Sequence, residues 1–405
     1  MATVAIIIVG ALVAGQVNRA IYGLAWNRRA ISPWSPVSGS TPARTWLDCV
    51  PVIGWWRLRR ETDVHGDGFW LRPALIELVL PIALAMLYRF EISGGLLPIG
   101  HAPVDPQVLR AQFASHAVLI VLMTVASFID LDEKLIPDEI TLPGTLCGLL
   151  LAAWLPSSLL PAWTSVGPPP YPIERLLLST PRTWSESFNG IVGLGIVFVC
   201  VVGWWYALLP KVLWYRGGVC KFWRYLLASI FRNRGSWWLT LLGLIVGGAT
   251  LFCWSCGGPA WQSLLSAWVG VAVGGGAIWM VRIVGSLALR QEAMGFGDVT
   301  LMGMIGAFMG WQTSLLVFFV APFTGLLIAV AQWLFTRRKD IPYGPFLCSA
   351  TLIVIVFWPI FWSRWGFPIF VLGWLLPVVL AISLLVLAVM LLLLQRVKAI
   401  FANAS

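Results

Sequence analysis

Long apolar runs separated by short polar segments dominate the pattern of this chain. A helix needs roughly 20 apolar residues to cross a hydrocarbon core of about 30 Å, and about eleven runs approach or exceed that length. They are residues 4–24, 71–90, 108–129, 140–160, 190–209, 237–256, 264–289, 299–311, 314–335, 346–362 and 367–394. The run at 299–311 is short for a full crossing, and the last run is long enough to tilt. The pattern predicts an all-α, polytopic transmembrane helical bundle of about eleven spans.

Composition indicates an integral membrane protein, and the distribution of charge predicts which of its loops are cytoplasmic. Hydrophobic residues make up 59% of the chain and charged residues 11%, whereas about a quarter of the residues in soluble domains are charged. If the runs cross the membrane in turn, most arginines and lysines fall on one side, above all in residues 25–71 and 211–236. The positive-inside rule makes that side cytoplasmic. The N-terminus is then outside and the C-terminus inside, and the net charge of +10 needs no nucleic-acid partner.

The runs divide the chain into four parts. Residues 1–160 form an N-terminal membrane part with the basic cytoplasmic loop 25–71 and the first of two acidic motifs. Residues 161–261 hold the rest of a proline-rich outer linker, an inserted helix pair and a second basic cytoplasmic loop. Residues 262–363 form another membrane part, which carries the second acidic motif, and residues 364–405 add a C-terminal span and a cytoplasmic tail. This order predicts that both acidic motifs lie at the cytoplasmic membrane face.

The first acidic motif is "FIDLDEKLIPDEITLPG", residues 128–144. Asp130 closes the third apolar run, and Asp138 lies at the start of the fourth. A calcium-binding loop is disfavoured because Lys134 occupies a ligand position. Three interpretations stay open for this segment: a solvated loop with an acidic helix start, an ion or proton relay, and one half of a catalytic pair.

The second motif, "GFGDVTLMGMIGAFMGW" (residues 295–311), places Asp298 at the mouth of another apolar run. Gly295 and Gly297 let the backbone approach a neighbour or a peptide closely. Two close carboxyl groups cannot both ionise easily, so one keeps a proton and the pair can activate water and protonate a leaving group. We therefore interpret Asp130 and Asp298 as the catalytic dyad of an aspartic protease.

The two motifs resemble those of the type IV leader peptidase family, the prepilin peptidases, which are GxGD intramembrane aspartic proteases. "IPYGPFL" (residues 341–347) is similar to a third family signature, and the resemblance extends over residues 10–160 and 262–360. It implies that Asp130 and Asp298 are catalytic and that no cofactor is needed. It also implies cleavage of the short basic leader of type IV prepilin-like or type II secretion pseudopilin precursors, at the cytoplasmic face of a bacterial inner membrane.

The chain departs from the family pattern in several places. Bifunctional family members carry two CxxC pairs in the first cytoplasmic loop, whereas this loop has Cys49 alone. No zinc site is therefore expected there, and N-methyltransferase activity with S-adenosylmethionine is unsupported. Thr300 replaces the lysine that usually follows GxGD, and residues 190–256 and 367–394 add spans to the usual plan. The three histidines and the single pair Cys253 and Cys256 do not indicate a metal site.

Four further residues are expected to support the dyad: Gly295, Gly297, Asp138 and Glu77. Asp138 is interpreted as a neighbour of the dyad or a helix cap. Glu77 lies about one turn inside the second run, where an acid is costly unless it is paired; it holds a substrate amine or an arginine, or pairs with Arg72. Asp132 and Glu133 are predicted to be solvated.

Two other classes of function compete with the peptidase. A transporter would use Asp130, Glu77 and Asp298 as a relay, but acids near helix centres and repeated segments, which transporters show, are not visible in the sequence. An inactive membrane scaffold of the same family would not need the retained aspartate pair. The lipid bilayer and a prepilin-like substrate are the expected partners, and the sequence leaves the oligomeric state open.

Overall fold

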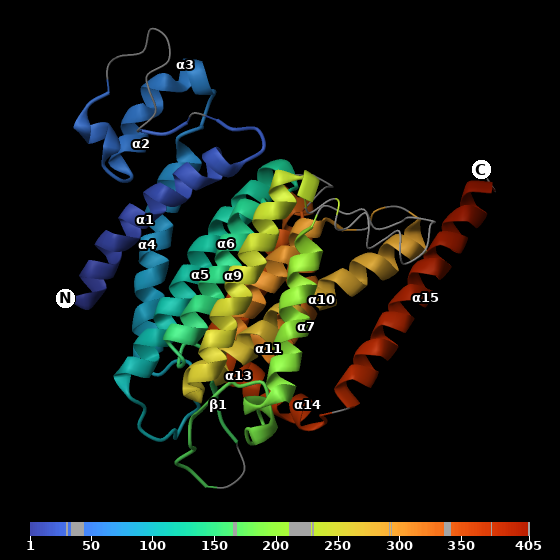
Figure 1. The fold of residues 1–405 in the computed structure, drawn as a ribbon. Helices are drawn as coiled ribbons and strands as arrows, with labels where there is room; N and C mark the ends of the chain where they lie inside the picture. The colour runs from blue at the N-terminus through green and yellow to red at the C-terminus, as the bar shows by residue number, and fades with distance from the viewer. Residues whose placement is uncertain are drawn as a thin grey trace.

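A computed structural model of the chain describes residues 1–29, 31–33, 44–164, 168–209, 228, 231–290, 292, 294–335, 342–373 and 375–403 (Figure 1). Its long helices are α1 (Ala2–Leu24), α4 (Leu71–Ile92), α5 (Pro106–Glu133), α6 (Asp138–Trp154), α7 (Ile191–Leu208), α9 (Arg234–Cys256), α10 (Gly258–Leu289), α11 (Phe296–Phe335), α12 (Gly344–Val356) and α15 (Leu375–Asn403). Its short helices are α2 (Ile53–Leu58), α3 (Thr62–His65), α13 (Trp358–Phe361) and α14 (Phe367–Val371). Strands β1 (Pro161–Ala162) and β2 (Glu174–Arg175) pair antiparallel.

The described residues confirm the predicted polytopic helical fold. Eight of their helices are long and apolar enough to cross a membrane, or up to nine if the bent pair Gly344–Val356 and Trp358–Val371 is one span. That pair bends by 85°, and α6 is only 17 residues long. The chain is therefore a multi-pass membrane protein, while the number of crossings and the orientation of the termini stay predictions. The loop predicted at 211–236 lies largely outside the described residues.

Helix α11 reverses direction at Gly310. This residue has φ 77° and ψ 171°, a conformation that glycine adopts without steric cost. A Cβ added at Gly274 of α10 would lie 2.7 Å from the carbonyl oxygen of Met302 and 3.3 Å from Ser314 Oγ. In a straight helix those two residues would be about 18 Å apart. The two apolar runs predicted on either side of Gly310 are thus two arms of a hairpin.

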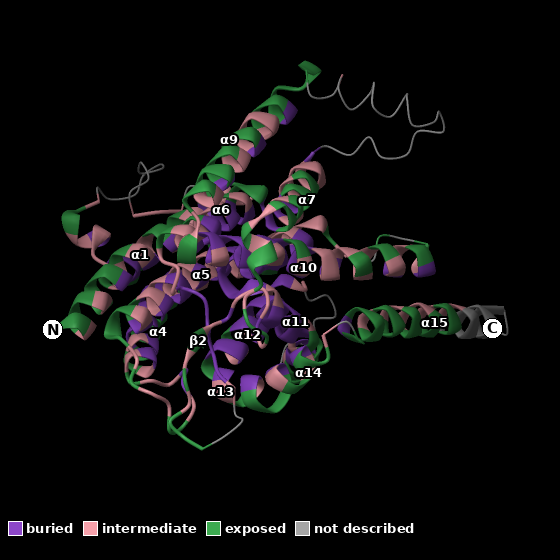
Figure 2. Ribbon diagram, turned by 60° about the horizontal axis from the view of Figure 1, so that its bottom comes forward, coloured by how far each residue is buried: buried purple, intermediate pink, exposed green. Residues whose placement is uncertain are grey.

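Backbone contact holds the first arm of α11 against α10. A Cβ added at Gly270 would lie 2.1 Å from the carbonyl oxygen of Gly306, and one added at Gly306 would lie 2.1 Å from that of Gly270. Facing glycines allow two membrane helices to approach this closely. Buried residues gather in this central region, with α5 and α12 beside it, whereas α15 is largely exposed (Figure 2). The close packing of α10 against the first arm of α11 therefore fixes the position of the start of α11.

The two ends of the bundle differ. One end, which we call the dyad face, carries the end of α5, the start of α11, and α2 and α3 (Figure 1). Strand β1 lies at the other end (Figure 1). The Gly310 turn lies near it, because the indole N–H of Trp311 donates a hydrogen bond of 3.0 Å to the carbonyl of Leu178, shortly after β2. There the segment predicted as an extended linker, residues 156–172, is extended at β1 but anchored: the indoles of Trp358 and Trp362 donate hydrogen bonds to its carbonyl oxygens at 2.7 and 2.9 Å.

Candidate active site

Asp130 lies on the buried side of the last turn of α5. The helix ends at Glu133 because Lys134 adopts a left-handed conformation (φ 55°), and the N–H of Lys134 binds the carbonyl of Asp130 at 2.8 Å. The Asp130 residue is 4% exposed. Its Oδ2 accepts a hydrogen bond of 3.0 Å from the backbone N–H of Gly344, at the start of α12. This contact fixes the orientation of the carboxyl group.

Asp298 lies in the first turn of α11, whose free backbone N–H groups favour negative charge. The residue is 8% exposed. A Cβ added at Gly295 would lie 3.7 Å from Asp298 Oδ2, and one added at Gly297 would lie 2.9 Å from Ile136 Cβ. Gly297 therefore allows the start of α11 to touch the segment that follows α5, a close approach of the kind expected from the motif.

The structure brings Asp130 and Asp298 together in one buried site. Ile136 lies against Gly297, the residue before Asp298, and against Gly344, whose N–H binds Asp130. The two carboxyl groups are near enough for their charges to influence each other. The ends of α5, α11 and α12 thus form a small enclosure around two acids, which is the arrangement that shared-proton chemistry requires.

Gly344 and Ile136 contribute to this site but were not among the predicted site residues. A Cβ added at Gly344 would lie 2.5 Å from Asp130 Oδ2 and 2.9 Å from Ile136 Cδ1, so only glycine fits without a shift of its neighbours. The one signal in the sequence was the glycine of "IPYGPFL". That motif did not show which residue its glycine would contact.

Asp132 is exposed, as predicted, and Glu133 is half-buried, but each also has a partner that the sequence did not show. Arg72 Nη1 donates to both carboxylate oxygens of Asp132, at 2.7 and 2.8 Å. Glu133 accepts hydrogen bonds from the backbone N–H groups of Trp26 (2.6 Å) and Asn27 (2.8 Å). These partners lie 60 residues or more away in the sequence, so no local pattern revealed them. The last turn of α5 is consequently tied to α4 and to the segment after α1.

Comparison with known families adds an independent finding. The model of the type IV leader peptidase family matches residues 117–219 and 191–330, which together make up more than half of the 405 residues and contain both aspartates. The chain belongs to the type IV leader peptidase family. The resemblance inferred from the motifs is thereby confirmed.

Individual relatives of this leader peptidase family member match it over shorter stretches. The prepilin leader peptidase/N-methyltransferase of Stutzerimonas stutzeri is 31% identical over 121 residues, 29% of this chain and 39% of the relative. The proteins of the same name from Pseudomonas putida and Escherichia coli K12 are each 33% identical, over 24% and 21% of this chain and 34% and 38% of the relatives. The chain thus spans less than two fifths of the length of these relatives. No solved structure matches it.

The structure places Glu77 between α1, α2 and α4 rather than at the dyad. Its carboxylate accepts hydrogen bonds from Asn18 Nδ2 (3.1 Å), the backbone N–H of Val52 (2.7 Å) and the indole N–H of Trp55 (2.8 Å). The alternative that Glu77 pairs with Arg72 was wrong, because Arg72 pairs with Asp132. Within the described residues, Glu77 therefore acts as an anchor for the loop that precedes α4.

Asp138 is the first residue of α6, and Pro137 takes the cap position before it. The side chain is exposed, at the positive end of the helix. It follows directly on the segment 134–137, which connects α5 to α6 and contains the site residue Ile136. The structure thus places Asp138 beside the candidate site but at its surface.

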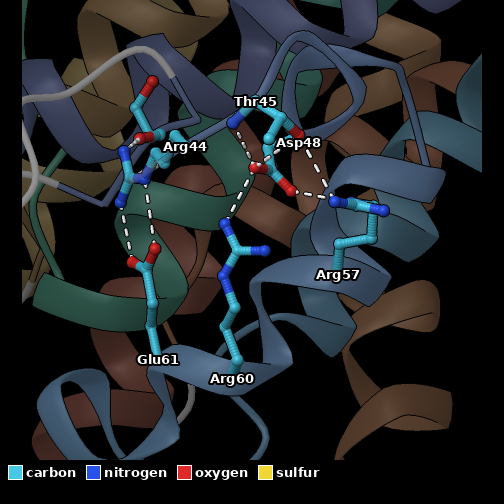
Figure 3. Close-up of polar contacts among 7 residues, drawn as sticks. Arg44, Thr45, Asp48, Arg57, Arg60 and Glu61 are labelled. Carbon is cyan, nitrogen blue, oxygen red and sulfur yellow. Dashed lines mark hydrogen bonds and ion pairs between the residues drawn. The ribbon is translucent and has the colours of Figure 1, made fainter. Parts of the chain in front are cut away.

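The first loop is organised around a buried carboxylate, Asp48 (Figure 3). Asp48 accepts hydrogen bonds from the backbone N–H of Thr45 (2.7 Å), Arg57 Nε (2.9 Å) and Arg60 Nη2 (2.8 Å). Burial opposes ionisation of Asp48, but these hydrogen bonds outweigh it and hold the pKa of the carboxyl well below its usual range. Asp48 is therefore charged at neutral pH and binds the loop together.

The same loop does not fit a zinc site. Cys49 is its single cysteine, and its buried acid Glu61 is bound by Arg44 through two hydrogen bonds of 3.1 and 2.7 Å (Figure 3). In the part of the chain that the structure describes, no group of three or more histidine, cysteine or acidic side chains could hold a metal ion. In the described part of this loop, both buried acids are therefore bound by arginines.

Proposed function

We propose that this chain is an aspartic endopeptidase that removes the short basic leader from type IV prepilin-like or type II secretion pseudopilin precursors. The main support for the proposal is that Asp130 and Asp298 are both buried at one site, where Ile136 packs against Gly297 beside Asp298 and against Gly344, which binds Asp130. Family membership supports the reaction class, and the names of the relatives support the class of substrate.

The proposed mechanism uses the two carboxyl groups as one unit with a single shared proton. The ionised group takes a proton from a water molecule, and the resulting hydroxide attacks the carbonyl carbon of the scissile peptide bond. The protonated group gives its proton to the carbonyl oxygen. When the C–N bond breaks, the leaving amine takes the proton that the first group removed from water, and a hydroxyl proton of the intermediate returns to the second group. The N–H of Gly344 orients Asp130 throughout.

We place the dyad face at the cytoplasmic side of a bacterial inner membrane. Arg57, Arg59, Arg60 and Arg72 lie in or next to the loop at this face, and positive residues favour the cytoplasmic side. The same rule keeps a basic leader on that side while the apolar helix behind it enters the bilayer. The scissile bond of such a precursor then meets the dyad at the level of the membrane surface.

N-methylation is not part of the proposal. The relatives are named as N-methyltransferases as well as peptidases, but the first loop of this chain is held by arginine–carboxylate pairs. One experiment can measure leader cleavage and methyl transfer separately. The purified protein is incubated with a prepilin in detergent, and the mass of the product is measured by mass spectrometry.

We expect a product that has lost the leader and carries no added methyl group, even when S-adenosylmethionine is present. A bifunctional relative treated identically is the positive control for both steps. Intact precursor after prolonged incubation would contradict the peptidase proposal, and a methylated product would contradict the exclusion of methyl transfer.

A further inference from the structure

Helix α2 exposes apolar side chains although its other side is already buried. Trp55 and Leu58 are each 1% exposed and pack in a small cluster with Ala74 of α4. On the opposite side, Ile53 is 54% exposed and Trp56 is 61% exposed. A segment with apolar residues on both sides needs two apolar environments, and the described residues supply only one of them.

The buried side fixes the depth of α2. The N–H groups of Val52 and the Trp55 indole both bind the carboxylate of Glu77, and a Cβ added at Gly15 would lie 3.7 Å from the same carboxylate. Gly15 is about nine residues, or roughly 14 Å, from the end of α1 at Leu24. The start of α2 therefore lies alongside α1 and α4, within their length, and not beyond their ends.

Three arginines, at positions 57, 59 and 60, come directly after the exposed residues Ile53 and Trp56 in the sequence. Arg57 and Arg60 bind Asp48, yet their side chains remain 35% and 28% exposed. Arg59 is exposed, and its guanidinium lies 5.5 Å from the ring centre of Trp56. Tryptophan and arginine at this depth are typical of the boundary between acyl chains and anionic headgroups.

We propose that α2 is an interfacial anchor that lies in the lipid surface at the dyad face. Ile53 and Trp56 enter the lipid boundary, and Arg59 with its neighbours Arg57 and Arg60 contacts anionic headgroups. The occupant is lipid because α1 and α4 cross the membrane on either side of the loop and hold α2 at the boundary depth. In Figure 1, α2 lies beside the upper ends of α1 and α4, outside the central bundle. The anchor does not depend on the peptidase reaction.

Site-directed spin labelling tests this proposal on the full chain. In a variant without the seven native cysteines, single cysteines replace Ile53, Trp56 or, as a control, Val64 of α3, which is 49% exposed. Each variant receives a nitroxide and is reconstituted into vesicles of phosphatidylethanolamine and phosphatidylglycerol. Collision with oxygen, which concentrates in lipid, is compared with collision with a water-soluble nickel chelate, and retention of the helical circular dichroism spectrum checks the fold.

We expect the ratio of oxygen to nickel collisions to be several times higher at positions 53 and 56 than at position 64, because α3 lies farther from the bundle than α2 does (Figure 1). Equal ratios at the three positions would overturn the proposal by showing α2 in water. Exclusion of both reagents from positions 53 and 56 would also overturn it, because that result indicates a protein surface, such as a second copy, over α2.

Discussion

The backbone N–H of Gly344 donates a 3.0 Å hydrogen bond to Oδ2 of Asp130, although the two residues are 214 positions apart in the sequence. This bond joins the start of α12 to the end of α5. Ile136, which packs against the start of α12, also packs against the start of α11, which carries Asp298. Gly344 and Ile136 together therefore connect the ends of the two helices that hold the aspartates.

Replacing Gly344 by alanine tests this connection. The added Cβ would lie 2.5 Å from Asp130 Oδ2, so the carboxyl group must move; overpacking of this kind costs about 1–3 kcal/mol. We expect kcat for prepilin cleavage to fall on the order of 100-fold, because a displacement of about 1 Å is enough for such a loss, with little change in KM.

The matched control is Gly276→Ala in α10, where an added Cβ meets no atom of the described residues within 4 Å. Steady-state kinetics on both variants separate the two positions. Equal activities would show that the Gly344 contact does not position the dyad.

Arg72 and Asp132 form an ion pair, and the side chain of each residue is 31% exposed. An exposed pair of this kind stabilises a protein by about 0.2–1 kcal/mol. Arg72 also stacks over the rings of Tyr22 and Phe128, at 5.4 and 5.7 Å, and each such contact adds about 0.5–1 kcal/mol. We therefore expect Arg72→Ala to lower the free energy of unfolding more than Asp132→Asn does. Denaturant titration in detergent measures both, with the exposed Arg110→Ala as control. The reverse order would contradict the stacking argument.

The lowered pKa of Asp48 predicts how the first loop responds to acid. A carboxyl group whose pKa is lower in the folded state stabilises that state fully above its unfolded pKa of about 3.9. The stabilisation is lost as the pH falls from there through the folded pKa. Limited proteolysis of the loop is expected to stay slow above about pH 4 and to accelerate below it. Asp48→Asn should be cleaved rapidly at neutral pH, and wild-type resistance in that variant would refute the role of Asp48.

Zinc should play no part in the stability of this loop, because Asp48 and Glu61 are already bound by arginines. We expect metal analysis of the purified protein to find no stoichiometric zinc. Treatment with a strong chelator should leave the rate of loop proteolysis unchanged. One zinc per chain, or faster proteolysis after chelation, would mean that ligands outside the loop complete a metal site.

The sequence predicted the helices well because each apolar run is set by local composition. It also placed Asp130 and Asp298 at helix ends, because a polar residue at the limit of an apolar run is visible directly. The partners of Asp132 and Glu77 could not be predicted in this way. They come from other helices at separations of 22 to 60 residues, and side-chain pairing over such distances depends on how the helices pack.

The break in α11 at Gly310 is a second feature that local sequence could not predict, here in the backbone. The sequence divided this region into two apolar runs but offered no reason for the division at a single glycine. The reason is tertiary: both arms pack against Gly274 of α10. Likewise, the contact of Gly344 with Asp130 exists only after α12 has packed against α5.

The most direct test of the account is a prepilin cleavage assay on Asp130→Asn, Asp298→Asn and the double variant. Asparagine keeps the size and polarity of each side chain but removes the acid. Because the two groups act as one unit, each single change should abolish cleavage and the double change should be no worse. Asp132→Asn, the matched control in the same turn of α5, should keep most activity. Near wild-type cleavage by a folded Asp130→Asn or Asp298→Asn protein would contradict the account.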